Sequence, residues 1–336
     1  MAVVPVVLAL ALAACGGSGD ETAGDPAAPA GAASGFPVTI EHTYGMTRIP
    51  DEPARVVTVG YNDHDFALAL GVTPVGVREW FGEQSSATWP WARDELSHAE
   101  PEVLSAEEIS FEQVAALRPD LILGVYSGMT ESDYAKLSRI APTVAQTDEY
   151  VAFGMPWQEQ TLLIGRALGR EDRAEELVRE VEARFARARA AHPEFRRATA
   201  LFAYREAGGG FGAYASTDAR GRFLRSLGFR SSGEIDELAG DQFFAQVSHE
   251  RLRLIDEDVL VMIDLADVAA SRAELVEDPL YRRLAAVREG RDVYPSVEVG
   301  AALSFSSPLS LPLAIDEIVP ELAEATERLD RESGEE

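Results

Sequence analysis

The chain has 336 residues, of which 57 are acidic and 30 basic, giving a formal net charge of −27 at pH 7, and 46% of the residues are hydrophobic. This length suits two compact units with cores of their own, because domains usually comprise about 100–200 residues. The charge argues against nucleic acid as a partner, since nucleic-acid binding needs clustered lysine and arginine.

Residues 1–15 form a short apolar run that ends in the sequence LAAC. The run is shorter than the about 20 apolar residues of a transmembrane helix, and it fits the core of a signal peptide followed by small residues. The sequence LAAC resembles the bacterial lipobox, in which the cysteine is acylated, so we expect lipidation at Cys15, the only cysteine. No lysine or arginine precedes the apolar core, which points to a translation start further upstream. A plain secretory signal with an incidental cysteine is the alternative.

Residues 16–35 consist mainly of glycine, alanine, proline and serine, a composition that cannot bury a core. We expect this segment to be a flexible tether, with the folded part beginning at Phe36. An acylated cysteine followed by a tether would hold the folded part outside the cytoplasm, anchored to the cell membrane by lipid.

From residue 36 the sequence alternates between strand and helix patterns, which predicts a parallel α/β lobe over residues 36–156. The helix after Ser110 carries an expected capping box with Gln113, and Pro119 ends it. The predicted elements are a hairpin over 36–47, strands over 55–60, 73–77, 120–125 and 143–145, and helices over 63–70, 110–118 and 134–140.

Residues 157–193 have a different character and predict a helical connector. A first helix is expected over 157–168, ending at Gly169. Residues 171–191 lack glycine and proline and are rich in alanine, glutamate and arginine, all strong helix formers. A helix of this span is roughly 30 Å long, enough to cross from one lobe to another.

The strand and helix rhythm then resumes and predicts a second α/β lobe over residues 194–330. The sequence therefore predicts two Rossmann-like α/β lobes joined by one long helix. The elements expected in the second lobe are strands over 198–204, 258–264 and 293–294, and helices over 222–227, 250–254 and 308–325.

A weak internal repeat relates the two lobes. The sequences ISFEQVAALRPDLIL, residues 109–123, and VSHERLRLIDEDVLV, residues 247–261, align at a constant offset that pairs Glu112 with Glu250. Each glutamate falls in the first turn of a predicted helix, where the helix dipole stabilises a carboxylate by ~0.3–1 kcal/mol. The dipole effect explains a glutamate at one helix start, but not why the two lobes carry glutamates at matching positions. Two matched acids, one per lobe, suit docking onto a partner with two-fold symmetry.

Catalytic and metal-binding signatures are sparse. The sequence has no Walker loop and no G-x-S-x-G elbow, and its five histidines show no ligand spacing. The glycine-rich stretch at 208–212 lacks a following helix start, so we interpret it as a loop, with phosphate binding as the alternative. We therefore expect neither an enzyme nor a metal site built from protein ligands.

Aromatic side chains gather at the predicted carboxyl ends of strands, where ligands bind in open α/β sheets. Small hydrophobic clusters under loops are the alternative explanation for any single one of them. Arginines in or beside the same loops either bind an anionic ligand or offset local acidity. The residues concerned are Tyr61, Arg78, Trp80, Phe81, Trp89, Trp91, Tyr126, Tyr204, Arg205 and Arg220.

Taken together, the chain resembles the bacterial substrate-binding lipoproteins of ABC importers for iron–siderophores, a family related to haem and cobalamin binding proteins. The resemblance rests on the order of several stretches that span nearly the whole chain after the tether. These are residues 53–77, 109–130, 227–235, 247–263 and 278–294, together with the sequence ALSFSSPLSLPLAIDEI.

The resemblance implies two lobes with a ligand cleft between them and no catalysis. It further implies that the protein is a monomer that captures a ferric siderophore and delivers it to an ABC permease dimer. Iron would be present only as part of that ligand. One glutamate per lobe would meet permease arginines, and the local motifs match at Glu112 and Glu250. The cleft residues expected by position are Tyr61, Arg78, Trp80, Trp91, Tyr126, Arg205 and Tyr214.

The net charge bears on the ligand. A triply anionic catecholate complex would approach against the field of the protein, whereas a neutral or cationic hydroxamate complex would not. We therefore favour a hydroxamate or mixed siderophore. Three alternatives remain. The first is a haem or cobalamin binding component, and a haem ligand would need an axial histidine or tyrosine in the cleft. The others are a surface lipoprotein without transport function and an enzyme that uses the cleft.

Overall fold

The computed structural model describes residues 35–206 and 208–333, with side chains up to residue 329. The chain divides into two units, Met1–Ala33 and Ser34–Glu336, of which the second is described here. The predicted signal peptide, the lipidation site at Cys15 and nearly all of the predicted tether lie outside the described residues.

The first lobe contains a five-stranded, fully parallel sheet in the order β5-β4-β3-β6-β7. A separate antiparallel hairpin precedes it, as the alternating pattern predicted. The strands of the hairpin are β1 (Val38–His42) and β2 (Gly45–Ile49), and those of the sheet are β3 (Val56–Thr58), β4 (Gly76–Arg78), β5 (Glu102–Leu104), β6 (Leu121–Gly124) and β7 (Thr143–Ala145).

Helix ends in this lobe follow local capping chemistry. Ser110 accepts a hydrogen bond from the Gln113 amide, but the return bond from Gln113 is missing, so the capping box predicted there is only half formed. A complete box between Thr130 and Asp133 starts the third helix at Glu131, earlier than predicted. The helices are α1 (Asp63–Ala69), α2 (Phe111–Ala116), α3 (Glu131–Leu137) and the 3-10 helices η1 (Ser85–Ala87) and η2 (Pro90–Leu96).

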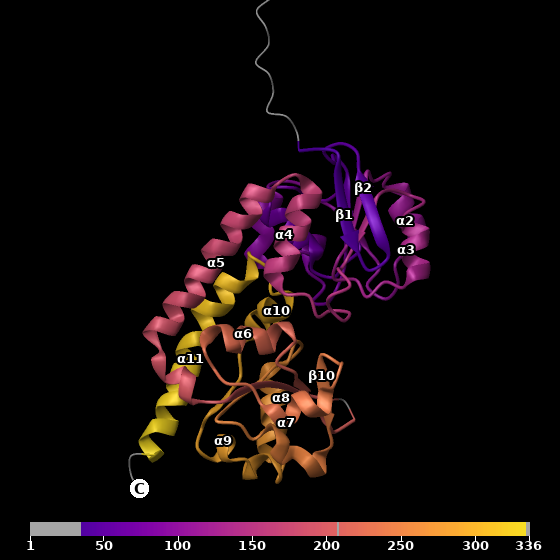
Figure 1. The fold of residues 1–336 in the computed structure, drawn as a ribbon. Coiled ribbons are helices and arrows are strands. Elements are labelled where there is room, and N and C mark those ends of the chain that lie inside the picture. Colours follow the sequence, from indigo (N-terminus) through magenta and orange to yellow (C-terminus); the bar gives the residue numbers. More distant parts are fainter. Residues whose placement is uncertain (1–34, 207, 334–336) are drawn as a thin grey trace, which may run out of the picture. The chain divides into compact units, whose positions relative to one another are not determined.

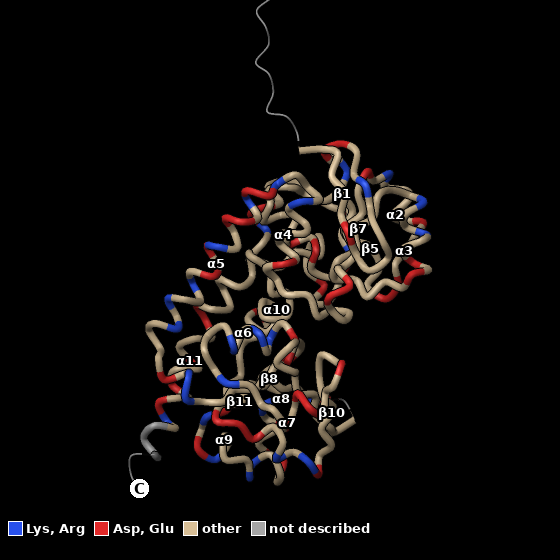
Figure 2. Tube along the Cα trace, in the orientation of Figure 1, with Lys and Arg blue, Asp and Glu red and all other residues tan. Residues whose placement is uncertain are grey.

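The connector consists of α4 (Trp157–Leu168) and α5 (Glu171–Ala191), with Gly169 in the left-handed conformation between them. The apolar face of α5 is buried, and its outer face carries ion pairs such as Arg173–Glu176 and Arg179–Glu175. Figure 2 shows the resulting alternation of acidic and basic positions along α5. In Figure 1, α5 runs beside the C-terminal helix α11 (Ser310–Ser333), and the two helices are in contact.

The second lobe contains a mixed sheet in the order β10-β9-β8-β11-β12. Strands β8, β11 and β12 are parallel, whereas β9 is antiparallel to both of its neighbours, β8 and β10. The glycine-rich stretch at 208–212 forms the turn between β8 and β9 and the start of β9. The strands are β8 (Ala200–Arg205), β9 (Phe211–Tyr214), β10 (Phe244–Val247), β11 (Val259–Met262) and β12 (Asp292–Val293).

The helices of the second lobe cover both faces of this sheet and include three short 3-10 segments. The predicted α-helix over 250–254 is one of these, so the internal repeat is only approximate in structure. The helices are α6 (Ala219–Leu227), α7 (Gly233–Ala239), α8 (Val268–Glu277), α9 (Ala285–Arg288), α10 (Val297–Phe305), η3 (Pro193–Arg197), η4 (His249–Ile255) and η5 (Tyr281–Arg283).

One hydrophobic cluster joins the two lobes through the connector. It includes Val56 of β3, Ile164 of α4, Phe185 of α5, Phe202 of β8 and Ile318 of α11. The predicted fold class of two α/β lobes joined by one long helix is thereby confirmed. In the part of the chain described, no helix combines the length and the apolar character needed to cross a membrane.

Candidate functional site

Six aromatic rings, which we call the aromatic cluster, meet at the carboxyl edge of the first sheet. Trp80 occupies its centre: the ring centroid lies 5.5 Å from that of Tyr61, 5.8 Å from Tyr126 and 5.2 Å from Phe305. The members are Tyr61, Trp80, Phe81, Tyr126, Phe153 and Phe305. Phe305 comes from α10 of the second lobe, so the cluster contains residues from both lobes.

The parallel topology brings these rings together. Tyr61, Trp80 and Tyr126 follow β3, β4 and β6, whose carboxyl ends share one edge of the sheet. The Tyr61 amide donates to the Tyr126 carbonyl over 3.0 Å, and both carboxylate oxygens of Asp63 accept backbone amides of the β6 loop. Burial raises the pKa of Asp63 to about 7, although these backbone donors act in the opposite direction. The loops carrying the rings are therefore held together by main-chain bonds.

Arg78 lies beneath Tyr61 and orients it. Its guanidinium lies 4.1 Å from the Tyr61 ring centroid and donates to the Tyr61 hydroxyl over 3.0 Å. The side chain is buried, and it also donates to the carbonyls of Val59, Ala106 and Glu107. Burial lowers the pKa of Arg78. Next to it, a cavity of about 460 Å³ is lined by Tyr61, Arg78 and Phe153 among others.

The second lobe contributes an arginine and two tyrosines. The Arg220 guanidinium lies 3.8 Å from the Tyr214 ring centroid, and the Tyr204 ring lies 5.2 Å from that of Tyr214. Arg220 is buried and donates to Asp218 over 2.8 Å and to Ser304 over 3.0 Å. Its positive charge is therefore balanced within the protein, and the net effect of its surroundings raises its pKa.

Tyr126 connects the two groups of residues. Only 4% of its surface is exposed, and its pKa is raised by burial and by the charge of Asp218. Phe153 of the aromatic cluster also lies 6.2 Å, between ring centroids, from Phe243 in the second lobe. The candidate site therefore consists of the aromatic cluster on one side and Tyr214 with Arg220 on the other.

The remaining residues predicted for the cleft are Trp91 and Arg205. Trp91 borders the cluster: its ring centroid lies 5.5 Å from that of Phe305, and it stacks on Trp89 and donates its indole N–H to Asp65 over 2.7 Å. Arg205 instead pairs with Glu274 of α8 over 2.8 Å. Tyr61, Arg78, Trp80, Trp91, Tyr126 and Tyr214 are the predicted residues that the structure brings together.

Sequence reasoning missed several residues of this site. Phe153 lies in the loop after β7, and Phe305 in the stretch ALSFSSPLS near the C-terminus. The rule that ligands bind after strand ends would have found Phe153. Phe305 ends a buried helix, and its sequence pattern gave no such signal. Arg220, left open between two roles, lies against Tyr214.

The glutamates predicted to dock on a partner lie apart from the candidate site residues. Glu112 lies in the first turn of α2 and Glu250 in the first turn of η4, and both are exposed. Neither makes a side-chain hydrogen bond or an ion pair with another described residue, so both carboxylates face solvent. Among the described residues there is also no group of histidine, cysteine, aspartate and glutamate side chains able to hold a metal ion.

Comparisons of sequence and of structure with known proteins point to the same kind of protein. The sequence model of a family described as "Periplasmic binding protein" matches residues 56–294. The chain is 36% identical to a periplasmic solute binding protein of Mycobacterium smegmatis, with a TM-score of 0.77 over 86% of this chain and 98% of that structure. It is 28% identical to PiaA of Streptococcus pneumoniae, solved in complex with ferrichrome, with a TM-score of 0.74 over 86% of this chain and 99% of that structure. A probable siderophore-binding lipoprotein of Bacillus subtilis, YfiY, is 28% identical over 75% of this chain and 78% of the relative.

Proposed function

Because the chain belongs to the periplasmic binding protein family, we propose that it is the substrate-binding component of an ABC importer and that its ligand is a ferric siderophore. The observation that carries this proposal is the candidate site, where Trp80, Tyr126 and Tyr214 face a common region from two lobes. The similarity to a ferrichrome complex and to a siderophore-binding lipoprotein supports the ligand class.

The chemistry of the site fits a chelate with an apolar backbone. Aromatic faces cover apolar surface and interact with cationic groups, and ligand sites of this kind carry few polar groups. The two arginines of the site do not provide much free positive charge, because Arg220 is paired with Asp218 and Arg78 is bonded to carbonyls. With a net charge of −27 on the chain, this favours a neutral or cationic hydroxamate complex or a mixed one over a triply anionic catecholate.

Delivery would need no covalent chemistry by this protein. We infer that Cys15 carries a lipid anchor outside the cytoplasm, and that the exposed Glu112 and Glu250 meet arginines of a permease dimer. ATP hydrolysis would take place elsewhere in the importer. The continuous helix α5 and the hydrophobic cluster across both lobes support small lobe movements rather than a wide hinge closure.

A tryptophan-fluorescence titration tests this function. The purified protein is titrated with ferric hydroxamates, ferric catecholates, haem and cobalamin, each siderophore with its iron-free form as control. We expect saturable quenching at submicromolar concentration by a ferric hydroxamate or mixed complex. Saturable binding of haem or cobalamin instead would assign the protein to that branch of the importers, and no response to any of them would favour a surface lipoprotein without transport function.

A further inference from the structure

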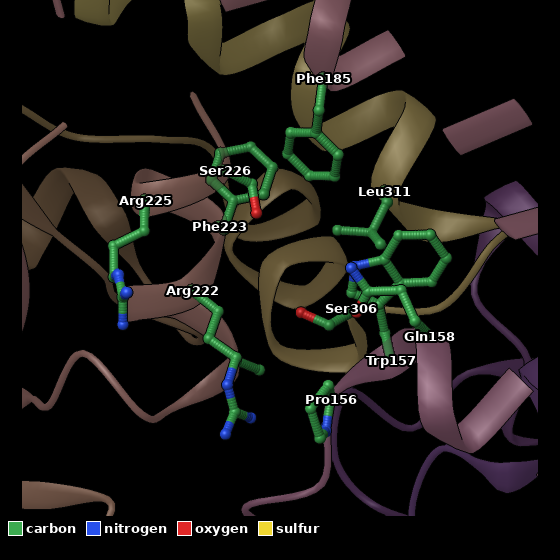
Figure 3. A pocket seen from close by; sticks show the side chains of 11 residues that line it. Pro156, Trp157, Gln158, Phe185, Arg222, Phe223, Arg225, Ser226, Ser306 and Leu311 are labelled. Carbon is green, nitrogen blue, oxygen red and sulfur yellow. The ribbon is translucent and has the colours of Figure 1, made fainter. Parts of the chain in front are cut away.

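A second cavity, of about 370 Å³, lies where the connector meets the second lobe. Its walls come from α4, α5, α6, α11 and the turn between α10 and α11, and Figure 3 shows its side chains. It shares no lining residue with the aromatic cluster. The lining residues are Pro156, Trp157, Gln158, Phe185, Ala219, Arg222, Phe223, Arg225, Ser226, Ser306 and Leu311.

One side of this cavity is apolar. Trp157, Phe185, Phe223 and Leu311 line it, and all four are buried in the protein apart from their contact with the cavity. In Figure 3, Trp157 and Leu311 lie across the cavity from Arg222 and Arg225. Small-molecule sites typically combine such an apolar wall with a few polar groups that fix orientation.

The residues that line the other side include two arginines, Arg222 and Arg225, and no acidic residue. Arg222 donates to the Gly154 carbonyl over 2.6 Å, a neutral partner. Arg225 is exposed and makes no side-chain hydrogen bond or ion pair with any other described residue. Burial lowers the pKa of Arg222, the negative charge of Asp218 opposes this effect, and the positive charge of Arg225 adds to it.

Carboxylates near this cavity are already engaged. Asp218 accepts two side-chain hydrogen bonds from Arg220, and Glu182 accepts one from Gln158 over 2.6 Å. The charge of Asp218 acts on Arg222, but its side-chain hydrogen bonds go to Arg220, so neither Arg222 nor Arg225 forms an ion pair with a described residue. An anion placed between them would satisfy donors that the protein leaves free, because arginine binds carboxylates through strong, paired hydrogen bonds.

We propose that this cavity is a second binding site, for a small organic carboxylate with an apolar or aromatic body. The carboxylate would accept hydrogen bonds from Arg222 and Arg225, and the apolar body would pack against Trp157 and Phe223. The lining of the cavity shares no residue with the aromatic cluster, although the charge of Arg222 acts on the pKa of Tyr126 in that cluster. Because its walls join the connector to α6, an occupant would bind across the junction between the connector and the second lobe.

Phenylacetate and its neutral amide, phenylacetamide, serve as probes in calorimetric titrations of the purified protein at low ionic strength. We expect saturable binding of phenylacetate and at least tenfold weaker binding of the amide. Arg225→Gln should weaken phenylacetate binding at least tenfold and leave folding intact, since this side chain is exposed and bonds to no side chain or carbonyl within the described part of the chain. Arg139→Gln removes an exposed arginine of the first lobe and should change nothing.

Three results would overturn the proposal: no saturable binding of phenylacetate, equal binding of the amide, or unchanged affinity in Arg225→Gln. Trp80→Ala provides the remaining test. If this change in the aromatic cluster abolishes phenylacetate binding, the acid occupies the candidate siderophore site and the second site does not exist. Unchanged phenylacetate affinity in Trp80→Ala, together with loss in Arg225→Gln, supports two sites.

Discussion

At the scale of single residues, the position of Trp80 makes it the most informative side chain of the candidate site. It contacts rings of both lobes, stacking on Tyr61 at 5.5 Å and lying 5.2 Å from Phe305 between ring centroids. Its indole is only partly buried, so part of this surface remains available to a ligand. A large, rigid aromatic surface in such a position is typical of residues that dominate binding energy.

Trp80→Ala is therefore expected to weaken binding of the ferric siderophore at least tenfold, or about 1.4 kcal/mol. The same titration applied to Tyr44→Ala, a partly buried tyrosine of the first lobe outside the cluster, should give the wild-type affinity. Thermal unfolding of both variants separates loss of binding from loss of folding. An unchanged affinity in folded Trp80→Ala would remove Trp80 from the ligand site.

At the scale of elements, Asp63 links the first turn of α1 to the loop after β6. It is fully buried and accepts the amides of Val125 and Tyr126 over 2.8 and 3.0 Å. Burial raises its pKa from 3.8 to about 7 in the folded protein. The folded state then holds this proton more tightly than the unfolded chain does, so the stabilisation from Asp63 is complete below pH about 4 and is lost as the pH rises through 7.

Asp63→Asn removes the titrating carboxyl group and so tests whether Asp63 makes the folded protein more stable at low pH than at high pH. The amide loses one acceptor, so we expect the variant to be less stable than wild type at low pH. The difference should shrink as the pH rises from 4 to 8, by at most about 1.4 kcal/mol per pH unit. Urea unfolding across this pH range measures it, with the exposed loop variant Asp241→Asn as a control for the loss of one charge. If the stability difference between wild type and variant grows with pH, the backbone donors, not burial, determine the direction of the pKa shift of Asp63.

The elements also show what the sequence could and could not predict. The bounds of α4 and α5 follow from glycine and proline alone, since Gly169 separates two segments of strong helix formers. Strand β5 was missed because it has three residues, two of them exposed, and therefore no apolar pattern. Segment η4 has helical spacing, but the choice of 3-10 over α geometry is made by packing that a sequence does not reveal.

The sequence also predicted only part of the candidate site, because it does not reveal tertiary contacts. The rule about strand ends placed Tyr61, Trp80 and Tyr126 together because their strands are parallel. It placed Arg205 there too, but β8 continues into an antiparallel pair with β9, and Arg205 turns to Glu274. Trp91 was expected in the cleft as an exposed loop residue; it does contact Phe305 of the cluster, but its indole N–H donates to the buried carboxylate of Asp65, which the sequence did not reveal. Side-chain partners of this kind depend on tertiary contacts between distant segments.

At the scale of the whole folded unit, buried polar bonds add to the hydrophobic connection between the lobes. Asn62 donates to the Phe305 carbonyl over 2.8 Å, and Ser307 donates to Asp65 over 2.7 Å. Hydrogen bonds to buried charged groups are strong and costly to break. The loop before α1, α1 itself and the turn after α10 are therefore fixed to each other, which supports the inference that the lobes move little when a ligand binds.

If the lobes move little, a partner must recognise the molecule through features of its surface, and the matched glutamates are the strongest candidates. We expect the double variant Glu112→Ala with Glu250→Ala to bind the ferric siderophore with wild-type affinity and to abolish uptake of radioactive iron by cells. Both side chains are exposed and pair with no residue that the structure describes, so their loss should not affect folding. Glu131→Ala with Glu234→Ala is the matched control, because these acids are also exposed and lie in first turns of α3 and α7. Loss of siderophore affinity in the first double variant, or equal loss of uptake in the control, would contradict a specific docking role for Glu112 and Glu250.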